Sequence, residues 1–228
     1  MRPGAVGRIL TELPDMTISE AVQNLRESKK AHLDIGKSMM KDAFFPLDFL
    51  AVATLNRSLC LITGFSTLIE SRNMVAAAPL FRMQLDNCLR FSAAWLVEKP
   101  HDFALRVLDG TPINRLKDMN GKPMTDRHLV ETLAVEYPWI KSTYEHSSGY
   151  VHLSEKHIFN CLSMKSEPQG AFTMKISDQD TFVPDQIYME VIEAFSEATK
   201  IVLKFATGWA FTKNNPKAVA EMKQRRVQ

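Results

Sequence analysis

The sequence lacks most of the short motifs that identify a known chemistry. It has three cysteines, Cys60, Cys88 and Cys161, an odd number that is widely spaced within apolar segments. This pattern disfavours both a disulfide framework and a metal site, and it predicts buried thiols in a reducing compartment. Internal repeats and low-complexity linkers are also missing, so the 228 residues are expected to form one domain with short extensions.

The chain also lacks a strong excess of charge of either sign. The net charge of +2 implies no global attraction to nucleic acid. The basic charge is concentrated in residues 213–228, where three lysines and two arginines face the single acidic residue Glu221. This end is interpreted either as a solubilising tail or as a contact for nucleic acid or a membrane surface. The expected organisation is an N-terminal extension over 1–16, one helical domain over 17–212, and a basic tail over 213–228 that is dispensable for folding.

Long uninterrupted hydrophobic runs are scarce. The most apolar segment, 49–69, contains Asn56 and Arg57 near its middle, which favours a buried helix over a membrane span. The first ten residues are basic but have no long apolar run of the kind found in signal peptides. The sequence therefore predicts a cytoplasmic protein without a membrane segment.

Apolar residues recur at helical spacing along most of the chain, between recognisable helix starts and stops. Thr17-Ile-Ser-Glu20 is a capping box, and Thr125 is expected to cap a later helix. The predicted helices are 18–43, 48–70, 74–97, 101–108, 112–119, 125–137, 138–154 and 185–211. Alternating residues at 157–165 and 171–177 predict a β-hairpin. The expected fold class is mainly α, a helical bundle with a small β-hairpin insertion before the last long helix, and with the second and third helices as a central antiparallel pair.

Charged residues on the third predicted helix form a narrow stripe. Arg82, Asp86 and Arg90 follow one another at intervals of four residues on a helix that is otherwise apolar. Burying these charges is costly unless they are paired or face a wet cavity. Two interpretations stay open: an ion-pair ladder within the helix, or a polar pocket shared with another helix.

The stretch YEHSSGYVHLSEKH, residues 144–157, contains three of the six histidines. On a helix over 138–154, Ser148, His152 and Glu155 follow at i, i+4 and i+7, with His152 near the edge of the buried face. A serine hydrolase is disfavoured because no nucleophile elbow or glycine-rich oxyanion loop surrounds Ser148. A metal site is disfavoured because His157 is rotated away from His152 on a helix, so neither a metal nor another cofactor is expected. Metal-free RNA cleavage requires less, namely a histidine to move a proton and a cation to stabilise the phosphate.

The pairing of LFRMQLDNCLRFSAAWL with the later YEHSSGYVHLS resembles the pattern of the HEPN-like superfamily, over roughly residues 50–155. The resemblance implies a helical bundle that is often dimeric and often acts as a ribonuclease in toxin–antitoxin and phage-defence systems. It carries His152 over as the motif histidine. The ribonuclease members place an arginine four to six residues before that histidine, whereas the matching positions here hold Glu145, His146, Ser147 and Ser148.

Two hypotheses follow from that departure. In the first, Arg82 supplies the missing cation from another helix, and Arg82, Asp86, Ser148 and His152 form the polar centre of a metal-independent ribonuclease or toxin of bacterial defence or stress response. In the second, the same cluster is a buried network that fixes a non-catalytic interaction module. A small-molecule-binding bundle is a third possibility. A homodimer is expected because the second helix has little polar surface and because the relatives pair; RNA and an antitoxin or other protein are the other expected partners.

Overall fold

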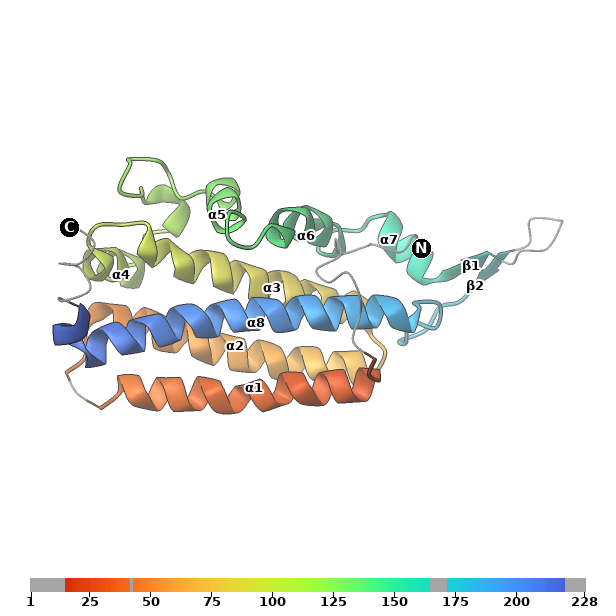
Figure 1. The fold of residues 1–228 in the computed structure, drawn as a ribbon. Helices are drawn as coiled ribbons and strands as arrows, with labels where there is room; N and C mark the ends of the chain where they lie inside the picture. The colour runs from red at the N-terminus through yellow and green to blue at the C-terminus, as the bar shows by residue number, and fades with distance from the viewer. Residues whose placement is uncertain (1–14, 42, 165–171, 220–228) are drawn as a thin grey trace.

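Four long helices lie side by side and form the body of the protein (Figure 1). The computed structural model describes residues 15–41, 43–164 and 172–219. The four long helices are α1 (Ile18–Met39), α2 (Pro46–Glu70), α3 (Met74–Ser92) and α8 (Asp185–Asn214). Shorter elements connect α3 to α8: η1 (Ala93–Trp95), α4 (Pro100–Leu108), η2 (Ile113–Arg115), α5 (Asp126–Leu133), α6 (Trp139–Ser147), η3 (Ser148–Tyr150), α7 (Glu155–Asn160), β1 (Leu162–Met164) and β2 (Phe172–Met174). The predicted fold class, a mainly α bundle with a β-hairpin before the last long helix, is confirmed.

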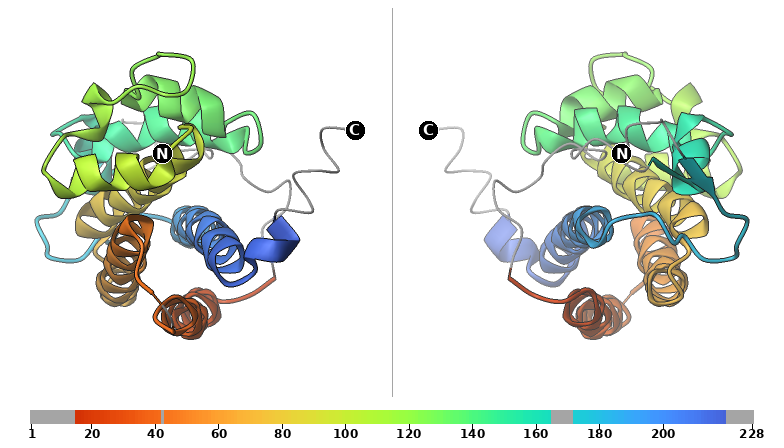
Figure 2. Two further views of the ribbon diagram at one scale, coloured as in Figure 1. Left: turned by 90° about the vertical axis from the view of Figure 1, so that its left-hand side faces the viewer. Right: turned by 90° about the vertical axis from the view of Figure 1, so that its right-hand side faces the viewer.

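The connection between α3 and α8 is long because both helices run in the same direction. Their first residues meet at one end of the bundle, where the Met74 backbone N–H donates to Asp180 and Arg72 pairs with Asp185 at 2.6 Å. At the other end, the Lys213 ammonium donates to the carbonyl of Met39. The segment from η1 to the hairpin therefore runs back over α3, and in the end-on views it forms a layer above the four-helix body (Figure 2).

Helices α2 and α3 form the antiparallel pair that the sequence predicts. The turn between them depends on Arg72, which has a positive φ of 59°. This strained conformation is supported by the ion pair with Asp185 and by the Tyr188 ring, whose centroid lies 4.4 Å from the Arg72 guanidinium. The predicted cap residues are also in place: Thr17 accepts from the Glu20 N–H at 3.2 Å, and Thr125 accepts from the His128 N–H at 3.3 Å.

Several predicted boundaries in the connecting segment are wrong. The helix expected over 112–119 is only the single turn η2, and the helix expected over 138–154 ends at Ser147, just before Gly149. Residues 157–160, predicted as the start of the hairpin, belong to α7 (Glu155–Asn160) instead, and the Ser154 N–H donates to His157 Nδ1 at 3.2 Å at its first turn. Local polar caps thus outweigh the alternating pattern there. Within the described residues the hairpin pairs Leu162 with Met174 and covers three residues on each side.

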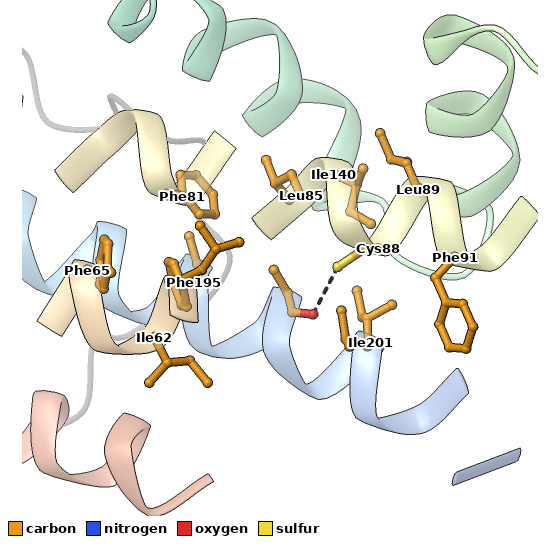
Figure 3. Close-up of a cluster of buried hydrophobic side chains, with 14 of the residues drawn as sticks. Ile62, Phe65, Phe81, Leu85, Cys88, Leu89, Phe91, Ile140, Phe195 and Ile201 are labelled. Atoms are coloured by element: carbon orange, nitrogen blue, oxygen red, sulfur yellow. Dashed lines mark hydrogen bonds between the residues drawn. The ribbon is translucent and has the colours of Figure 1, made fainter. Parts of the chain in front are cut away.

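Aromatic and aliphatic side chains from α2, α3 and α8 fill the centre of the bundle (Figure 3). The rings of Phe65 and Phe195 stack with centroids 4.2 Å apart. The Cys88 thiol is buried beside them and donates to the carbonyl of Ala198 at 2.9 Å, and burial raises its pKa. Of the three cysteines expected to be buried, Cys88 is buried, but Cys60 is exposed and Cys161 is partly exposed, which corrects the expectation for those two.

A buried ion pair fastens the end of α8 to the start of α2. The Lys213 ammonium lies 2.9 Å from the Asp48 carboxylate, and their side chains are 2% and 0% exposed. Asp48 also accepts hydrogen bonds from the Trp209 indole and the Phe45 backbone, at 2.8 Å each.

The expected tail boundary is therefore misplaced, because Lys213 belongs to α8 and is packed into the body. Residues 216–219 form a further helical turn, and residues 220–228 lie outside the described residues, as do 1–14 of the expected N-terminal extension.

A layer of neutral polar side chains crosses the interior of the bundle, and all four long helices contribute to it. We define this buried polar layer as His32, Ser58, Gln84 and Thr199. His32 Nε2 lies 2.9 Å from Ser58 Oγ, and the Gln84 amide donates to Ser58 Oγ at 2.7 Å and to Thr199 Oγ1 at 3.0 Å. His32 Nδ1 donates to the Ser28 carbonyl at 2.9 Å, and burial lowers the pKa of His32, which favours a neutral imidazole whose Nε2 accepts from Ser58. The Gln84 side-chain oxygen also accepts from the Asn87 amide at 3.4 Å, so the layer is hydrogen-bonded inside the bundle to its own members, to Asn87 and to the backbone.

Helix α2 is long and apolar enough to cross a membrane by length and composition alone. In the structure it packs against α1, α3, α4 and α8, as expected of a central helix of a bundle. The interpretation of segment 49–69 as a bundle helix is confirmed.

Candidate functional site

A cavity of about 410 Å³ lies between α2, α3 and the loop that follows η3. We call it the arginine cleft, and its walls are Arg57, Pro79, Arg82, Met83, Asp86, Val151 and His152. Three of the four predicted site residues, Arg82, Asp86 and His152, therefore lie in one place. Ser148 falls in η3, and its side chain lies outside the part of the chain that is described.

Asp86 joins two arginines at the side of the cleft. Its carboxylate accepts from Arg90 at 3.1 Å on the same helix and from Arg57 of α2 at 3.2 Å. The ladder expected along α3 is thus half formed, because Asp86 pairs with Arg90 whereas Arg82 takes no part in it. The second arginine of the pair comes from α2 instead. Both carboxylate oxygens of Asp86 accept hydrogen bonds from arginines, so in this cleft Asp86 orients Arg57 and Arg90.

Arg82 lies over an aromatic ring. Its guanidinium carbon is 3.6 Å from the centroid of the Tyr144 ring, which projects from α6. Within the described ranges Arg82 has no carboxylate partner at ion-pair distance. A cation held by a ring face keeps its N–H donors available around the edge of the guanidinium plane. Arg82 can therefore donate hydrogen bonds to an anion in the cleft.

Asp126, at the start of α5, contacts both Tyr144 and Arg90. It accepts from the Tyr144 hydroxyl at 2.7 Å and pairs with Arg90. Burial alone would raise the pKa of the Asp126 carboxyl, but the Tyr144 hydrogen bond and the charges of Arg90 and Arg82 lower it below its usual value. Burial and the bond to Asp126 raise the pKa of Tyr144 to about 12, so the phenol stays neutral.

His152 is placed differently from the expectation. It lies in the turn after η3, exposed to solvent, because the helix carrying Tyr144 ends at Ser147. The predicted Ser148–His152–Glu155 helix face is therefore wrong, since Glu155 begins a separate helix, α7. His152 nevertheless lines the arginine cleft together with Arg82. An exposed imidazole at the mouth of a cleft can exchange protons with both solvent and ligand.

The charge around the cleft is positive. Arg57, Arg82 and Arg90 stand against the carboxylates of Asp86 and Asp126, which leaves one uncompensated positive charge. Protonation of His152 would add another. The remaining walls, Pro79, Met83 and Val151, are apolar. This combination suits a ligand that carries both an anionic group and an apolar or flat group.

Two contributors to the cleft were missed by the sequence reasoning. In the sequence, Arg57 argues against a membrane span but gives no further sign of a site, although it is the one charged residue between Asp48 and Glu70. Tyr144 was placed at a helix face without a partner. The sequence signal for Arg57 was its position as a lone arginine within an apolar helix. Tyr144 has no such signal, because its contact with Arg82 spans 62 positions of the sequence.

The described part of the chain contains no group of three or more His, Cys, Asp or Glu side chains that could hold a metal ion. The fold and the cleft define an α-helical bundle with a cationic, partly apolar surface cleft. No protein-family model, curated protein or solved structure matches the chain.

Proposed function

We propose that the arginine cleft binds a phosphodiester of single-stranded RNA and that His152 moves a proton there, so that the protein acts as a metal-independent ribonuclease in the cytoplasm. The observation that carries this proposal is the placement of Arg82, a guanidinium without a carboxylate partner among the described residues, in the same cavity as the exposed His152. The role in bacterial defence or stress response rests on the resemblance to the HEPN-like superfamily.

The proposed chemistry requires only groups that line the cleft. His152, as a neutral base, takes the proton of the ribose 2′-hydroxyl while the 2′-oxygen forms a bond to phosphorus. The bond from phosphorus to the 5′-oxygen breaks, the leaving oxygen takes a proton from water, and protonated His152 returns its proton to the hydroxide that remains. Arg82 and Arg57 stabilise the negative charge that develops on the phosphoryl oxygens. The products are a 2′,3′-cyclic phosphate and a free 5′-hydroxyl.

Asp86 supports a second candidate function. Its two ion pairs, with Arg57 and Arg90, link α2 to α3, as expected of a network that orders an interaction surface. In a non-catalytic module the cleft would bind an anionic segment of a protein partner, such as an antitoxin, without reaction.

A homodimer is also proposed, with α2 at the interface. The exposed residues of α2 between its ends recur at alternating intervals of four and three, the spacing of a helix–helix seam. They are Phe49, Ala53, Asn56, Cys60, Thr63 and Thr67, none of them charged. Light scattering is expected to give twice the monomer mass at micromolar concentration, and a purely monomeric protein would count against the seam.

The binding test uses a short fluorescein-labelled single-stranded RNA. Arg82→Gln is expected to weaken binding and to reduce the slope of log affinity against log salt by about 0.7, the value for one lost contact to a single strand. The matched control is Arg127→Gln, because Arg127 is exposed, pairs with Glu131 and does not line the cleft. Equal binding by the wild type and Arg82→Gln would refute the proposal.

A further inference from the structure

Tyr144 lies beside the arginine cleft and contacts one of its arginines without lining the cleft itself. Tyr144 touches Arg82 through its ring face at 3.6 Å and Asp126 through its hydroxyl at 2.7 Å. Arg82 comes from α3, whereas Asp126 and Tyr144 come from α5 and α6, which follow each other later in the sequence. We propose that Tyr144 is a positioning residue, which holds the Arg82 guanidinium flat against its ring and aims the N–H donors into the arginine cleft.

The contacts on each side of Tyr144 make the ring a fixed platform. Its hydroxyl donates to Asp126, and Asp126 is in turn held by Arg90. Arg90 also pairs with Asp86, which pairs with Arg57 at the opposite wall of the cleft. The chain of contacts therefore runs from one cleft arginine to the other through Asp86, Arg90, Asp126 and Tyr144. A phenol that stays neutral, with its pKa raised to about 12, keeps this connection intact across the physiological pH range.

A ring face is a suitable support for a ligand-binding arginine. A carboxylate at the same position would occupy two of the guanidinium N–H groups and would compete with an anionic ligand for the charge. The ring instead attracts the cation through its quadrupole and leaves the in-plane donors free. An arginine that is ordered before the ligand arrives loses less conformational freedom on binding. Tyr144 thus affects affinity for an anion without touching it.

This inference rests on the proposed function, and its test separates the two. The RNA affinity of Tyr144→Leu, which removes the ring, is expected to fall roughly tenfold, as the loss of a partly desolvated cation–π contact predicts. Tyr144→Phe keeps the ring but loses the bond to Asp126, so a smaller loss is expected. Tyr137→Leu is the matched control, because Tyr137 also lies under a cation, Lys204 at 5.3 Å, but away from the cleft. Its affinity is expected to equal that of the wild type.

A double-mutant cycle distinguishes positioning from packing. If Tyr144 acts through Arg82, then Tyr144→Leu weakens RNA binding in the wild type but not in the Arg82→Gln protein. An equal loss in both backgrounds, or full affinity in Tyr144→Leu, overturns the inference while leaving the proposed function intact. Equal binding by the wild type and Arg82→Gln defeats the proposed function, and the inference falls with it. The NMR signal of the Arg82 Nε–H group adds a check without RNA: it is expected to shift in Tyr144→Leu and to stay near its wild-type position in Tyr144→Phe.

Discussion

The buried polar layer and the arginine cleft share helices α2 and α3, but their polar groups are treated in opposite ways. In the layer, the imidazole of His32 has a partner for each nitrogen, and the Gln84 amide donates both of its hydrogens to hydroxyls within the bundle. In the cleft, Arg82 has only a ring for support and His152 is exposed. On α3, Gln84 and Arg82 are two positions apart and therefore point to different sides of the helix.

The number of unused hydrogen-bond donors distinguishes a structural polar cluster from a ligand-binding site. A closed network rigidifies the fold, and opening it costs stability because a buried group is left without a partner. A cleft with unused donors adds little to stability, because water already satisfies those donors. Mutations in the layer should therefore change the free energy of unfolding, and mutations in the cleft should change binding. The predictions below test this division.

The largest loss of stability is expected at the charged counterpart of the layer, the buried pair of Lys213 and Asp48. Lys213→Met leaves the Asp48 carboxylate buried without its cation, which should lower the free energy of unfolding by about 3–5 kcal/mol. Urea unfolding monitored by circular dichroism measures this. The double variant Lys213→Met/Asp48→Leu removes both charges and is expected to recover much of the loss. If residues from Lys213 onward were dispensable for folding, both variants would be as stable as the wild type, which would contradict this prediction.

Breaking the neutral layer should cost less. Ser58→Ala leaves His32 Nε2 and one Gln84 donor without partners, so the free energy of unfolding should fall by about 1–3 kcal/mol. Ser66→Ala is the matched control on the same helix. Ser66 is also fully buried, but among the described residues its hydroxyl has no hydrogen-bond partner, so its removal should cost little. Equal destabilisation by the two changes would show that the layer contributes no more than packing.

The layer should also make stability depend on pH. Burial lowers the pKa of His32, so between that value and about 6.5, the usual pKa of the unfolded residue, the unfolded chain binds more protons. The stability from neutral His32 is fully present above about pH 6.5 and is lost as the pH falls below it. Comparing urea unfolding at about pH 7 and about pH 5 for the wild type and His32→Gln measures this. The variant should lose the His32 part of the acid sensitivity, and an unchanged pH profile would contradict the assignment of a neutral imidazole.

The smallest change in stability is expected in the cleft itself. Arg82→Gln should lower the free energy of unfolding by about 0.5–1 kcal/mol, because it removes only the cation–π contact with Tyr144 at a partly exposed position. Its unfolding curve is compared with that of Ser58→Ala under the same conditions. A loss as large as that of Ser58→Ala would make Arg82 part of the structural framework and would remove the contrast between the two regions.

The helices of the body could be predicted from the sequence because their signals are local. Thr17 and Glu20 cap α1, Thr125 caps α5, and the apolar periodicity follows directly from one face meeting the core. The grouping of Arg82, Asp86 and His152 was also predicted, although the helix assumed for His152 was wrong. The reason is that a costly charged group on a buried helix needs a polar neighbour, whichever element supplies it.

The buried polar layer and the Lys213–Asp48 pair could not be predicted in the same way. Ser58 and His32 are 26 positions apart, and Lys213 and Asp48 are 165 positions apart. A serine or glutamine inside an apolar pattern does not show which helix it faces, because that depends on the path of the connecting segment. The parallel course of α8, which brings Thr199 to Gln84, follows from the long return over α3 and has no local signature.

The most direct test of the account is RNA cleavage by His152→Ala, measured together with the melting temperature of the same sample. His146→Ala is the matched control, because His146 is also exposed but does not line the cleft. We expect the cleavage rate of His152→Ala to fall about 10²–10⁴-fold, as for the loss of a general base, and its melting temperature to equal that of the wild type. We expect His146→Ala to cleave RNA at the wild-type rate. A wild-type protein that does not cleave RNA, together with a melting temperature lowered in His152→Ala, would contradict the account.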